Sequence, residues 1–342
     1  KEELVAHMLC AGLLKNELEG RKGPPMDKTS DAEEKFTSSL EFVLTGAQKR
    51  TWEEIRSDLK GNRPMRRLLQ GDVGSGKTLV GALSALHAHE NGWQTAFMCP
   101  TEILAEQHHL SLSEWFSSLG LSVELLTGST KSSERKEIIT KLKSGEINLL
   151  VGTHALFQKD VIFNCLGLTV IDEQHRFGVH QRFSMLEKGG TDNQSPHQLI
   201  MTATPIPRTL AMTVYGSLET SIIDEMPPGR KPVETSARPN SLREKVIKRI
   251  EEVCLSGQRV YWVCTLIEES EELEAQSAED LFKEISESLP KIDVGLVHGK
   301  LKKKSKDQVI KKFREGKIQL LVCTTVIEVG VDVPEATLMI IE

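Results

Sequence analysis

The sequence lacks several features, and each absence excludes a class of protein. It has no excess of positive charge: 43 Lys and Arg against 49 Asp and Glu give a net charge of −6. That balance excludes a histone-like protein that holds nucleic acid by bulk charge, although a local basic groove stays possible. No apolar run approaches the roughly 18 residues that a membrane-spanning helix needs. The charged, amphipathic first 20 residues do not resemble a secretion signal.

Paired cysteines are also missing. The six cysteines are scattered and form no CxxC motif, which argues against a zinc site. Such spacing is typical of reduced, mostly buried thiols in a cytoplasmic protein. The chain starts with Lys1 and not with Met, so we interpret it as a segment of a longer protein.

The composition is that of an ordinary globular protein, with 39% hydrophobic and 27% charged residues in a chain of 342. At ~150 residues per domain, this length predicts about two domains. Residues 1–20 carry leucines at helical spacing, and residues 26–40 are polar. Residues 1–40 are therefore predicted to be a connecting helix and a linker.

From about residue 41, short apolar runs alternate with helical stretches. Strands separated by helices indicate a parallel sheet covered on both faces, and right-handed crossovers then give a doubly wound α/β domain at 41–225. The predicted strands are 67–69, 95–98, 123–126, 148–151, 169–171, 199–201 and 221–223, and the predicted helices are 77–90, 102–118 and 132–143.

The proline- and glycine-rich stretch at 226–232 can continue neither a helix nor a central strand, so residues 226–236 are predicted to be a linker. The alternation then restarts, which predicts a second α/β domain at 237–342. Its last strand runs to Glu342 with no helix after it, so we expect this domain to be truncated. The predicted helices are 241–255, 270–288 and 303–314, and the predicted strands are 259–263, 293–297, 319–323 and 337–341.

The strongest chemical signal is the segment 71–78, GDVGSGKT, which matches the P-loop pattern G-x-x-x-x-G-K-[ST]. It follows a predicted strand and opens a predicted helix, which is the context that the motif requires. Backbone N–H groups and the helix N-terminus would hold phosphates, Lys77 would reach the β- and γ-phosphates, and the Thr78 hydroxyl would bind Mg²⁺. The alternative is a glycine-rich turn that only joins strand to helix. The predicted nucleotide-binding residues here are Gly71, Asp72, Gly74, Ser75, Gly76, Lys77 and Thr78.

A second signal is the acidic pair that ends the predicted strand at 169–171. Asp172 would hold Mg²⁺, and Glu173 would polarise the water that attacks the γ-phosphate. We therefore assign catalytic roles to Lys77, Asp172 and Glu173. Alone, such a pair is usually a solvated turn, but a P-loop about 100 residues earlier favours the catalytic interpretation.

These motifs resemble those of superfamily 2 helicases. The P-loop, the DEQH box at 172–175, TATP at 202–205 and TTVIEVGVDV at 324–333 are similar to helicase motifs I, II, III and V. The longer sequence segments at 100–108, 151–158, 172–182, 201–212 and 324–334 resemble those of the RecG family of branched-DNA helicases. This resemblance extends over residues 41–342. The implied fold is two tandem RecA-like domains. The Mfd family shares the TATPIPRT block, but Gln174 favours the RecG family.

The resemblance implies further site residues. Gln48 would read the adenine of ATP; the alternative is a surface glutamine at a helix start. Singly, the threonines at strand ends could be ordinary helix caps. Gln174, His175, Thr202, Thr204 and Glu328 would couple nucleotide state to DNA; Gly330 and Asp332 would face the nucleotide; Pro100, Thr101, Thr127, Gly128, Thr153, His154 and Thr325 would contact the DNA strand.

The resemblance also implies the activity. It indicates an ATP-dependent DNA translocase that uses ATP and Mg²⁺ to remodel stalled forks and Holliday junctions. The partners would be branched or duplex DNA, the motor would be monomeric, and it would be cytoplasmic and nucleoid-associated. A later arginine motif is absent from the chain, so we expect the segment itself to hydrolyse ATP weakly. The alternatives are an Mfd-like motor and a nucleotide-binding module without turnover.

Overall fold

The structure is a computed structural model, and it describes residues 21–173, 194–204, 218–227, 233–265, 271–324, 333 and 335–342. The chain divides into two compact units, Lys1–Lys231 and Pro232–Glu342. Each unit is built on its own parallel sheet, which confirms the predicted α/β fold class. No helix in the described ranges is both long and apolar enough to cross a lipid bilayer.

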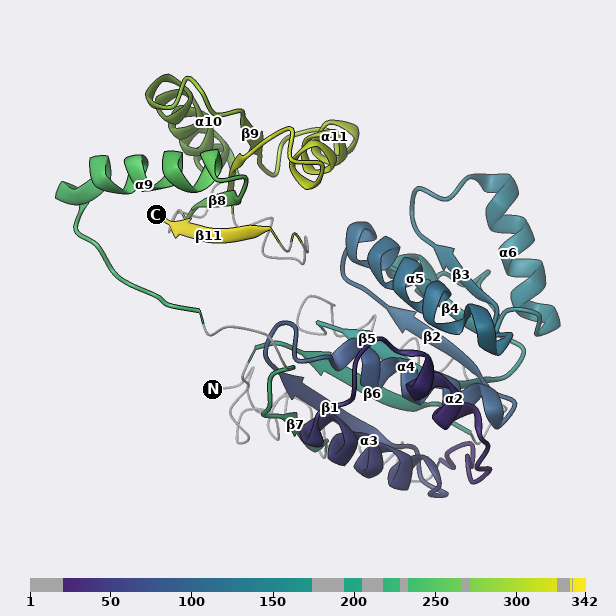
Figure 1. Ribbon diagram of the computed structural model, residues 1–342. Coiled ribbons are helices and arrows are strands. Elements are labelled where there is room, and N and C mark those ends of the chain that lie inside the picture. The colour runs from purple at the N-terminus through teal and green to yellow at the C-terminus, as the bar shows by residue number, and fades with distance from the viewer. Residues whose placement is uncertain are drawn as a thin grey trace, which may run out of the picture. The chain divides into compact units, whose positions relative to one another are not determined.

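The first unit contains a seven-stranded sheet in the order β3-β4-β2-β5-β6-β1-β7 (Figure 1). Every paired strand in it is parallel, so the carboxyl ends of all seven lie along one edge. The strands are β1 Arg66–Gly71, β2 Gln94–Met98, β3 Val123–Leu126, β4 Leu149–Gly152, β5 Leu166–Asp172, β6 His197–Thr202 and β7 Glu219–Ile223.

Helices cover both faces of this sheet, as the doubly wound prediction requires. Along β2 the side chains alternate: the Phe97 ring packs at a tilt against His108 of α5, with ring centroids 5.0 Å apart, while Ala96 and Met98 join a cluster on the opposite face. The helices are α2 Ala32–Ser39, α3 Gly46–Leu59, α4 Lys77–Glu90, α5 Glu102–Phe116 and α6 Ser132–Ser144, with short 3₁₀ turns at Ser117–Leu119 and His154–Phe157.

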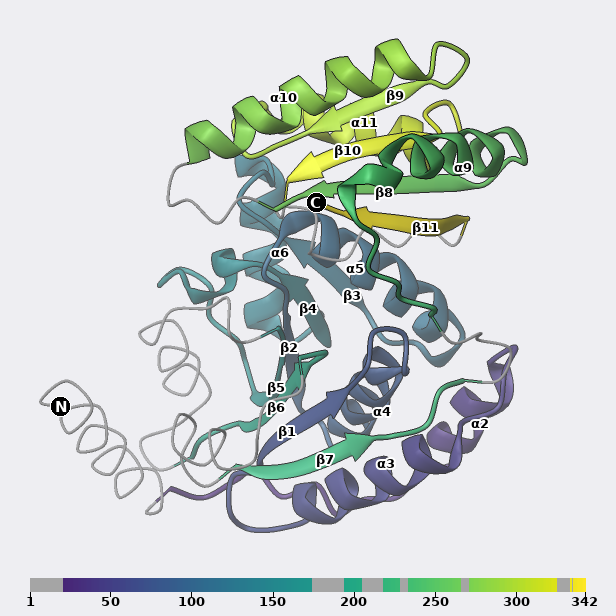
Figure 2. The same ribbon diagram turned by 90° about the vertical axis from the view of Figure 1, so that its left-hand side faces the viewer.

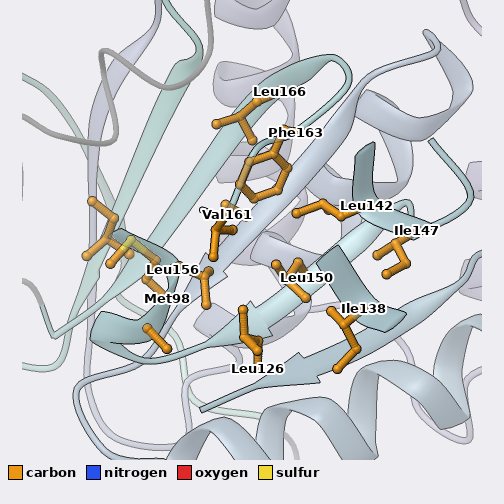
Figure 3. Close-up of a cluster of buried hydrophobic side chains, with 13 residues drawn as sticks. Met98, Leu126, Ile138, Leu142, Ile147, Leu150, Leu156, Val161, Phe163 and Leu166 are labelled. Atoms are coloured by element: carbon orange, nitrogen blue, oxygen red, sulfur yellow. The ribbon is translucent and has the colours of Figure 1, made fainter. Parts of the chain in front are cut away.

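The cluster on that opposite face contains apolar side chains from the sheet and from α6 (Figure 3). Leu126 and Leu150 come from β3 and β4, and Ile138 and Leu142 come from one face of α6. The leucines are fully buried. A Leu→Ala change at such a site costs about 2–5 kcal/mol, so this cluster fixes the strands whose ends carry the predicted DNA contacts.

Residues 26–40 differ from the linker predicted for them. They contain α2, and Phe36 on that helix is fully buried, 6.3 Å from the Trp115 ring and 5.5 Å from the Phe116 ring. Met26 is fully buried as well. Because most residues of the segment are polar, its composition did not indicate these two buried side chains. The preceding helix predicted at 1–20 lies outside the described residues.

The second unit contains a four-stranded parallel sheet in the order β11-β8-β10-β9 (Figure 2). The predicted helices and strands are all present, with bounds that differ by a few residues. The strands are β8 Arg259–Cys264, β9 Val294–Val297, β10 Leu320–Thr324 and β11 Ala336–Ile341; the helices are α9 Arg243–Leu255, α10 Glu271–Ser288 and α11 Lys303–Arg314, with a 3₁₀ turn at Asn240–Leu242.

Buried thiols line the core of the second unit. Cys254, Cys264 and Cys323 are free and buried, as predicted. Burial raises the pKa of Cys254 and of Cys264 to about 11 and that of Cys323 to about 12. Because the thiolate is the reactive form, these cysteines are chemically inert packing residues.

A buried histidine attaches the N-terminal part of the first unit to its sheet. His197 on β6 accepts a hydrogen bond from the Met65 backbone N–H through Nδ1 (2.8 Å), so Nε2 carries the proton and donates it to the Pro24 carbonyl (2.7 Å). Burial lowers the pKa of His197 to about 4 from 6.5, because the charged imidazolium would be desolvated. Burial also lowers the pKa of His87, which bonds the Met26 carbonyl.

We predict that acid destabilises the chain through these histidines. The unfolded chain takes up the His197 proton near pH 6.5, whereas the folded chain resists until about pH 4. Stability is therefore unaffected above pH 6.5 and falls as the pH drops toward 4, by about 1–3 kcal/mol. Urea unfolding across this pH range measures the effect. His197→Gln keeps a donor and an acceptor but does not titrate, so its pH slope should be shallower; an unchanged slope would contradict the assignment.

Candidate functional site

Three loops meet at the carboxyl edge of the first sheet because β5, β6 and β1 are neighbours in it. Asp172 at the end of β5 pairs in register with Met201 of β6, and Thr202 pairs with Gln70 of β1. The P-loop follows β1, and the acidic pair ends β5. The strand order thus brings together the P-loop, the acidic pair and the Thr202–Thr204 segment, which are far apart in the sequence.

The P-loop has the geometry that its sequence predicts. It runs from the end of β1 to the start of α4, whose N-cap Gly76 has a φ of 88° in the left-handed region that favours glycine. A Cβ at position 76 would also collide with the Gln48 side chain. The Lys77 ammonium donates to the carbonyls of Gly71 (2.8 Å) and Asp72 (3.0 Å), so it lies over the loop at the N-terminus of α4.

Gln48 holds the P-loop in place from the neighbouring helix. Its side-chain N–H donates to the Ser75 carbonyl (2.8 Å), and its Oε1 accepts from the Thr45 N–H (2.9 Å). The Thr45 hydroxyl accepts from the Gln48 N–H in return, which completes a capping box at the start of α3. Gln48 is 3% exposed, so it is not a surface glutamine. Its reading of adenine stays a prediction.

Glu173 is held by the segment that follows β6. Its carboxylate accepts hydrogen bonds from the Ala203 N–H (2.9 Å) and the Thr202 hydroxyl (3.2 Å), and the Thr202 Oγ1 accepts from the Thr204 N–H (3.1 Å). Its backbone has a φ of 49°, the only positive φ of a non-glycine residue in the described ranges. A left-handed conformation costs about 1–2 kcal/mol for such a residue, and strain of this kind gathers at functional sites.

Asp172 has a partner that sequence reasoning did not find. Its Oδ2 lies 3.0 Å from Nε2 of His108 on α5, and both side chains are 12% exposed. A signal for His108 was present in the sequence: it lies four residues after Leu104 and four before Leu112, which are both buried. A histidine within the apolar stripe of a helix must find a polar partner.

The predicted DNA contacts gather on the other half of the same sheet edge. Pro100 and Thr101 follow β2, Thr127 and Gly128 follow β3, and the Thr153–His154 pair follows β4. These three strands are adjacent in the sheet. The loops also touch, because a Cβ on Gly128 would lie 3.9 Å from the His154 ring.

Two contacts tie this edge to α5. The Thr101 Oγ1 caps the helix by accepting from the Leu104 N–H (3.4 Å), so the predicted capping alternative is also true of this residue. The Glu102 carboxylate accepts from both the Ser129 N–H (3.1 Å) and the Ser129 hydroxyl (3.0 Å). The first turn of α5 is therefore joined to the loop after β3.

Several predicted residues lie outside the part of the chain that the structure describes, and their roles stay predictions. Thr78 is described, at the start of α4 beside Lys77. The residues outside are Gln174, His175, Thr325, Glu328, Gly330 and Asp332.

Comparison with protein families matches both units. The family model "DEAD/DEAH box helicase" matches residues 45–213, and "Helicase conserved C-terminal domain" matches residues 244–342. Each family model falls within one of the two compact units.

Curated relatives match along the whole chain. It is 52% identical to "ATP-dependent DNA helicase RecG" of Pasteurella multocida (strain Pm70) and to that of Escherichia coli (strain K12), covering 100% of this chain and 49% of each relative. The protein of the same name from Thermotoga maritima is 46% identical, with 43% of its length covered. The chain thus spans about half the length of the curated relatives it matches.

Solved structures of helicases are similar to this chain in fold. A "Structure of RecG bound to three-way DNA junction" matches with a TM-score of 0.83 and 43% identity, over 99% of this chain and 44% of that one. The structure of Mss116p bound to ssRNA and AMP-PNP matches with a TM-score of 0.65 at 17% identity, over 90% of this chain and 66% of that one. At that identity the second match shows the fold alone.

We predict that Lys77→Ala weakens the binding of ATP by roughly 10–100-fold, since a charge-assisted hydrogen bond contributes about 1.5–3 kcal/mol. Titration with a fluorescent ATP analogue measures the affinity. Lys143→Ala, an exposed lysine on α6, is the control for charge removal. Equal affinities of the Lys77→Ala variant and the parent would refute the phosphate contact.

Proposed function

Because the chain belongs to the RecG family of ATP-dependent DNA helicases, we propose that it is the motor of a translocase that remodels branched DNA. The observation that carries the proposal is the common edge of the first sheet. The P-loop and the acidic pair lie at the ends of β1 and β5. The loops that are predicted to contact the DNA strand, here called the strand-contact loops, lie at the ends of β2, β3 and β4. Since β2 and β5 are neighbours, ATP and DNA would occupy adjoining halves of this edge.

ATP would be held by its phosphates at the P-loop. The N-terminus of α4 offers backbone N–H groups and a favourable dipole, and the Lys77 ammonium would exchange the carbonyls of Gly71 and Asp72 for phosphate oxygens. Gln48 would keep the loop in shape during that exchange through its bond to the Ser75 carbonyl. The family to which the chain belongs is ATP-dependent, which fits this arrangement.

Mg²⁺ would be held by the Thr78 hydroxyl and the Asp172 carboxylate. Both offer oxygen, which is the ligand type that Mg²⁺ prefers, and the Asp172 side chain stands at the end of β5 with one oxygen bonded to His108. The ion would neutralise charge on the phosphates during transfer. The donor set at this edge therefore fits the metal.

Glu173 would orient the attacking water and take its proton. Both of its oxygens accept hydrogen bonds, from Ala203 and Thr202, which fixes the direction of the carboxylate. The chain of bonds from the Thr204 N–H through Thr202 to Glu173 also connects the base to the segment after β6. We propose that this chain reports the state of the nucleotide to the rest of the motor.

DNA would be held by its backbone. The loops after β2, β3 and β4 offer threonine and serine hydroxyls and backbone N–H groups, which bind phosphates without reading bases. The proposed substrates are stalled forks and Holliday junctions, on which a monomeric motor would act in the nucleoid of the cytoplasm. The similarity to the solved structure of RecG bound to a three-way DNA junction supports a branched substrate.

We predict that Glu173→Gln abolishes turnover but spares binding. Gln cannot accept a proton, so DNA-stimulated phosphate release should fall by roughly 10²–10⁴-fold, while the affinities for ATP and DNA stay within a few-fold of the parent. Release is measured on the full-length protein with a forked substrate. A matched control is Glu137→Gln, an exposed glutamate on α6. Undiminished turnover in Glu173→Gln would remove Glu173 from the role of base.

A further inference from the structure

Helix α5 connects the two halves of the sheet edge. Its first turn is bonded to the loop after β3 through Glu102 and Ser129, and its second turn is bonded to Asp172 through His108. From Thr101 to His108 the helix rises about 10 Å, at roughly 1.5 Å per residue. One short, rigid element thus contacts both the proposed DNA strand site and the proposed metal ligand.

The bond between His108 and Asp172 fixes one carboxylate oxygen. A carboxylate only accepts hydrogen bonds, so Nε2 of His108 is the donor, over 3.0 Å. The His108 imidazole also packs against the Phe97 ring, and the two ring centroids are 5.0 Å apart. Because both polar side chains are 12% exposed, little water competes for the bond. A movement of α5 would therefore move the Asp172 carboxylate or break its bond.

The contact at the other end of α5 lies in the loop that is proposed to bind a DNA phosphate. The Ser129 N–H donates to the Glu102 carboxylate at 3.1 Å and to the Thr127 Oγ1 at 3.3 Å, and the Ser129 hydroxyl donates to the same carboxylate at 3.0 Å. A DNA phosphate that approached this N–H would lie beside the Glu102 carboxylate, and the repulsion between the two anions would weaken the contact of Glu102 with Ser129. Besides the bonded state in the structure, the first turn of α5 would then have a DNA-bound state, released from Ser129.

We propose that His108 is a positioning residue that couples strand binding to metal–nucleotide binding. The proposal rests on the proposed function. Release of Glu102 by a DNA phosphate frees the first turn of α5, and His108 transmits the resulting shift to Asp172. By linkage, Mg²⁺ and nucleotide at Asp172 change the affinity for DNA by the same factor.

If His108 had a purely structural role, the variants would behave differently. If the histidine only fills the space beside Phe97, an isosteric apolar residue should serve as well, and the coupling should survive. The two roles are separated by His108→Leu, which removes the donor at similar volume, and by His108→Gln, which retains an N–H donor on a flexible side chain. His109→Leu is the matched control, since that position lies about 100° further around the helix.

The experiment measures the affinity of the full chain for a fluorescent ATP analogue with Mg²⁺, with and without a single-stranded oligonucleotide. We expect the oligonucleotide to change the affinity of the parent by about 10-fold, and that of His108→Leu by less than about 2-fold, the change that 0.4 kcal/mol makes. The variants His108→Gln and His109→Leu should keep the parental change. In EDTA, all four proteins should bind the analogue equally, because the effect runs through the metal ligand.

The outcomes separate the inference from the proposed function. A parental change in His108→Leu, or an equal loss in His108→Gln or His109→Leu, overturns the role of His108 and leaves the motor intact. If the oligonucleotide has no effect on the parent, the inference falls; if it also fails to stimulate ATP turnover by the full-length protein, the proposed function falls with it. If His108→Leu does not fold, His108→Asn, whose shorter side chain ends before Asp172, takes its place with the same expected loss.

Discussion

The parallel order of the strands in the first sheet is the constraint on which the rest depends. Because β3, β4, β2, β5, β6 and β1 all point the same way, the loops that follow them form one continuous edge. The P-loop, the acidic pair and the strand-contact loops are separated by up to about a hundred residues in the sequence, yet they are neighbours along that edge. Ligands of open parallel sheets bind at the carboxyl ends of the strands, so the proposed ATP and DNA sites would lie within one rigid layer.

Single polar side chains join these loops to one another. Gln48 joins α3 to the P-loop, Glu173 joins the end of β5 to the segment after β6, and Glu102 joins α5 to the loop after β3. His108 then joins α5 to Asp172. A buried polar group left unsatisfied costs about 1–3 kcal/mol, so the bond of the buried Gln48 to the P-loop stabilises the ligand-free site. If ATP or DNA bound as we propose, it would take the place of some of these partners, and the bonds that join the loops would change with it.

The sequence was sufficient for whatever depends on local pattern. The apolar runs predicted every strand that the described ranges contain, and the motif at 71–78 predicted the turn into α4, because both depend on neighbouring residues. Long-range pairs were not predictable in this way. No residue near His108 in the sequence indicates that its partner is Asp172. Because most of residues 26–40 are polar, their composition did not indicate that Phe36 is buried. Helix α3 was not among the predicted helices, although the sequence could have predicted its start, since Thr45 and Gln48 have the spacing of a capping box. The roles assigned to Gln48 and to the strand-contact residues still depend on resemblance.

A crystal structure of the chain with Mg²⁺ and a non-hydrolysable ATP analogue tests the central claim most directly. The account predicts that the triphosphate lies along the P-loop, that the Lys77 ammonium has left the carbonyls of Gly71 and Asp72 for phosphate oxygens, and that the metal stands between Thr78 and Asp172. A triphosphate bound elsewhere, with Lys77 still on its own loop and Asp172 turned away from any metal, would contradict it.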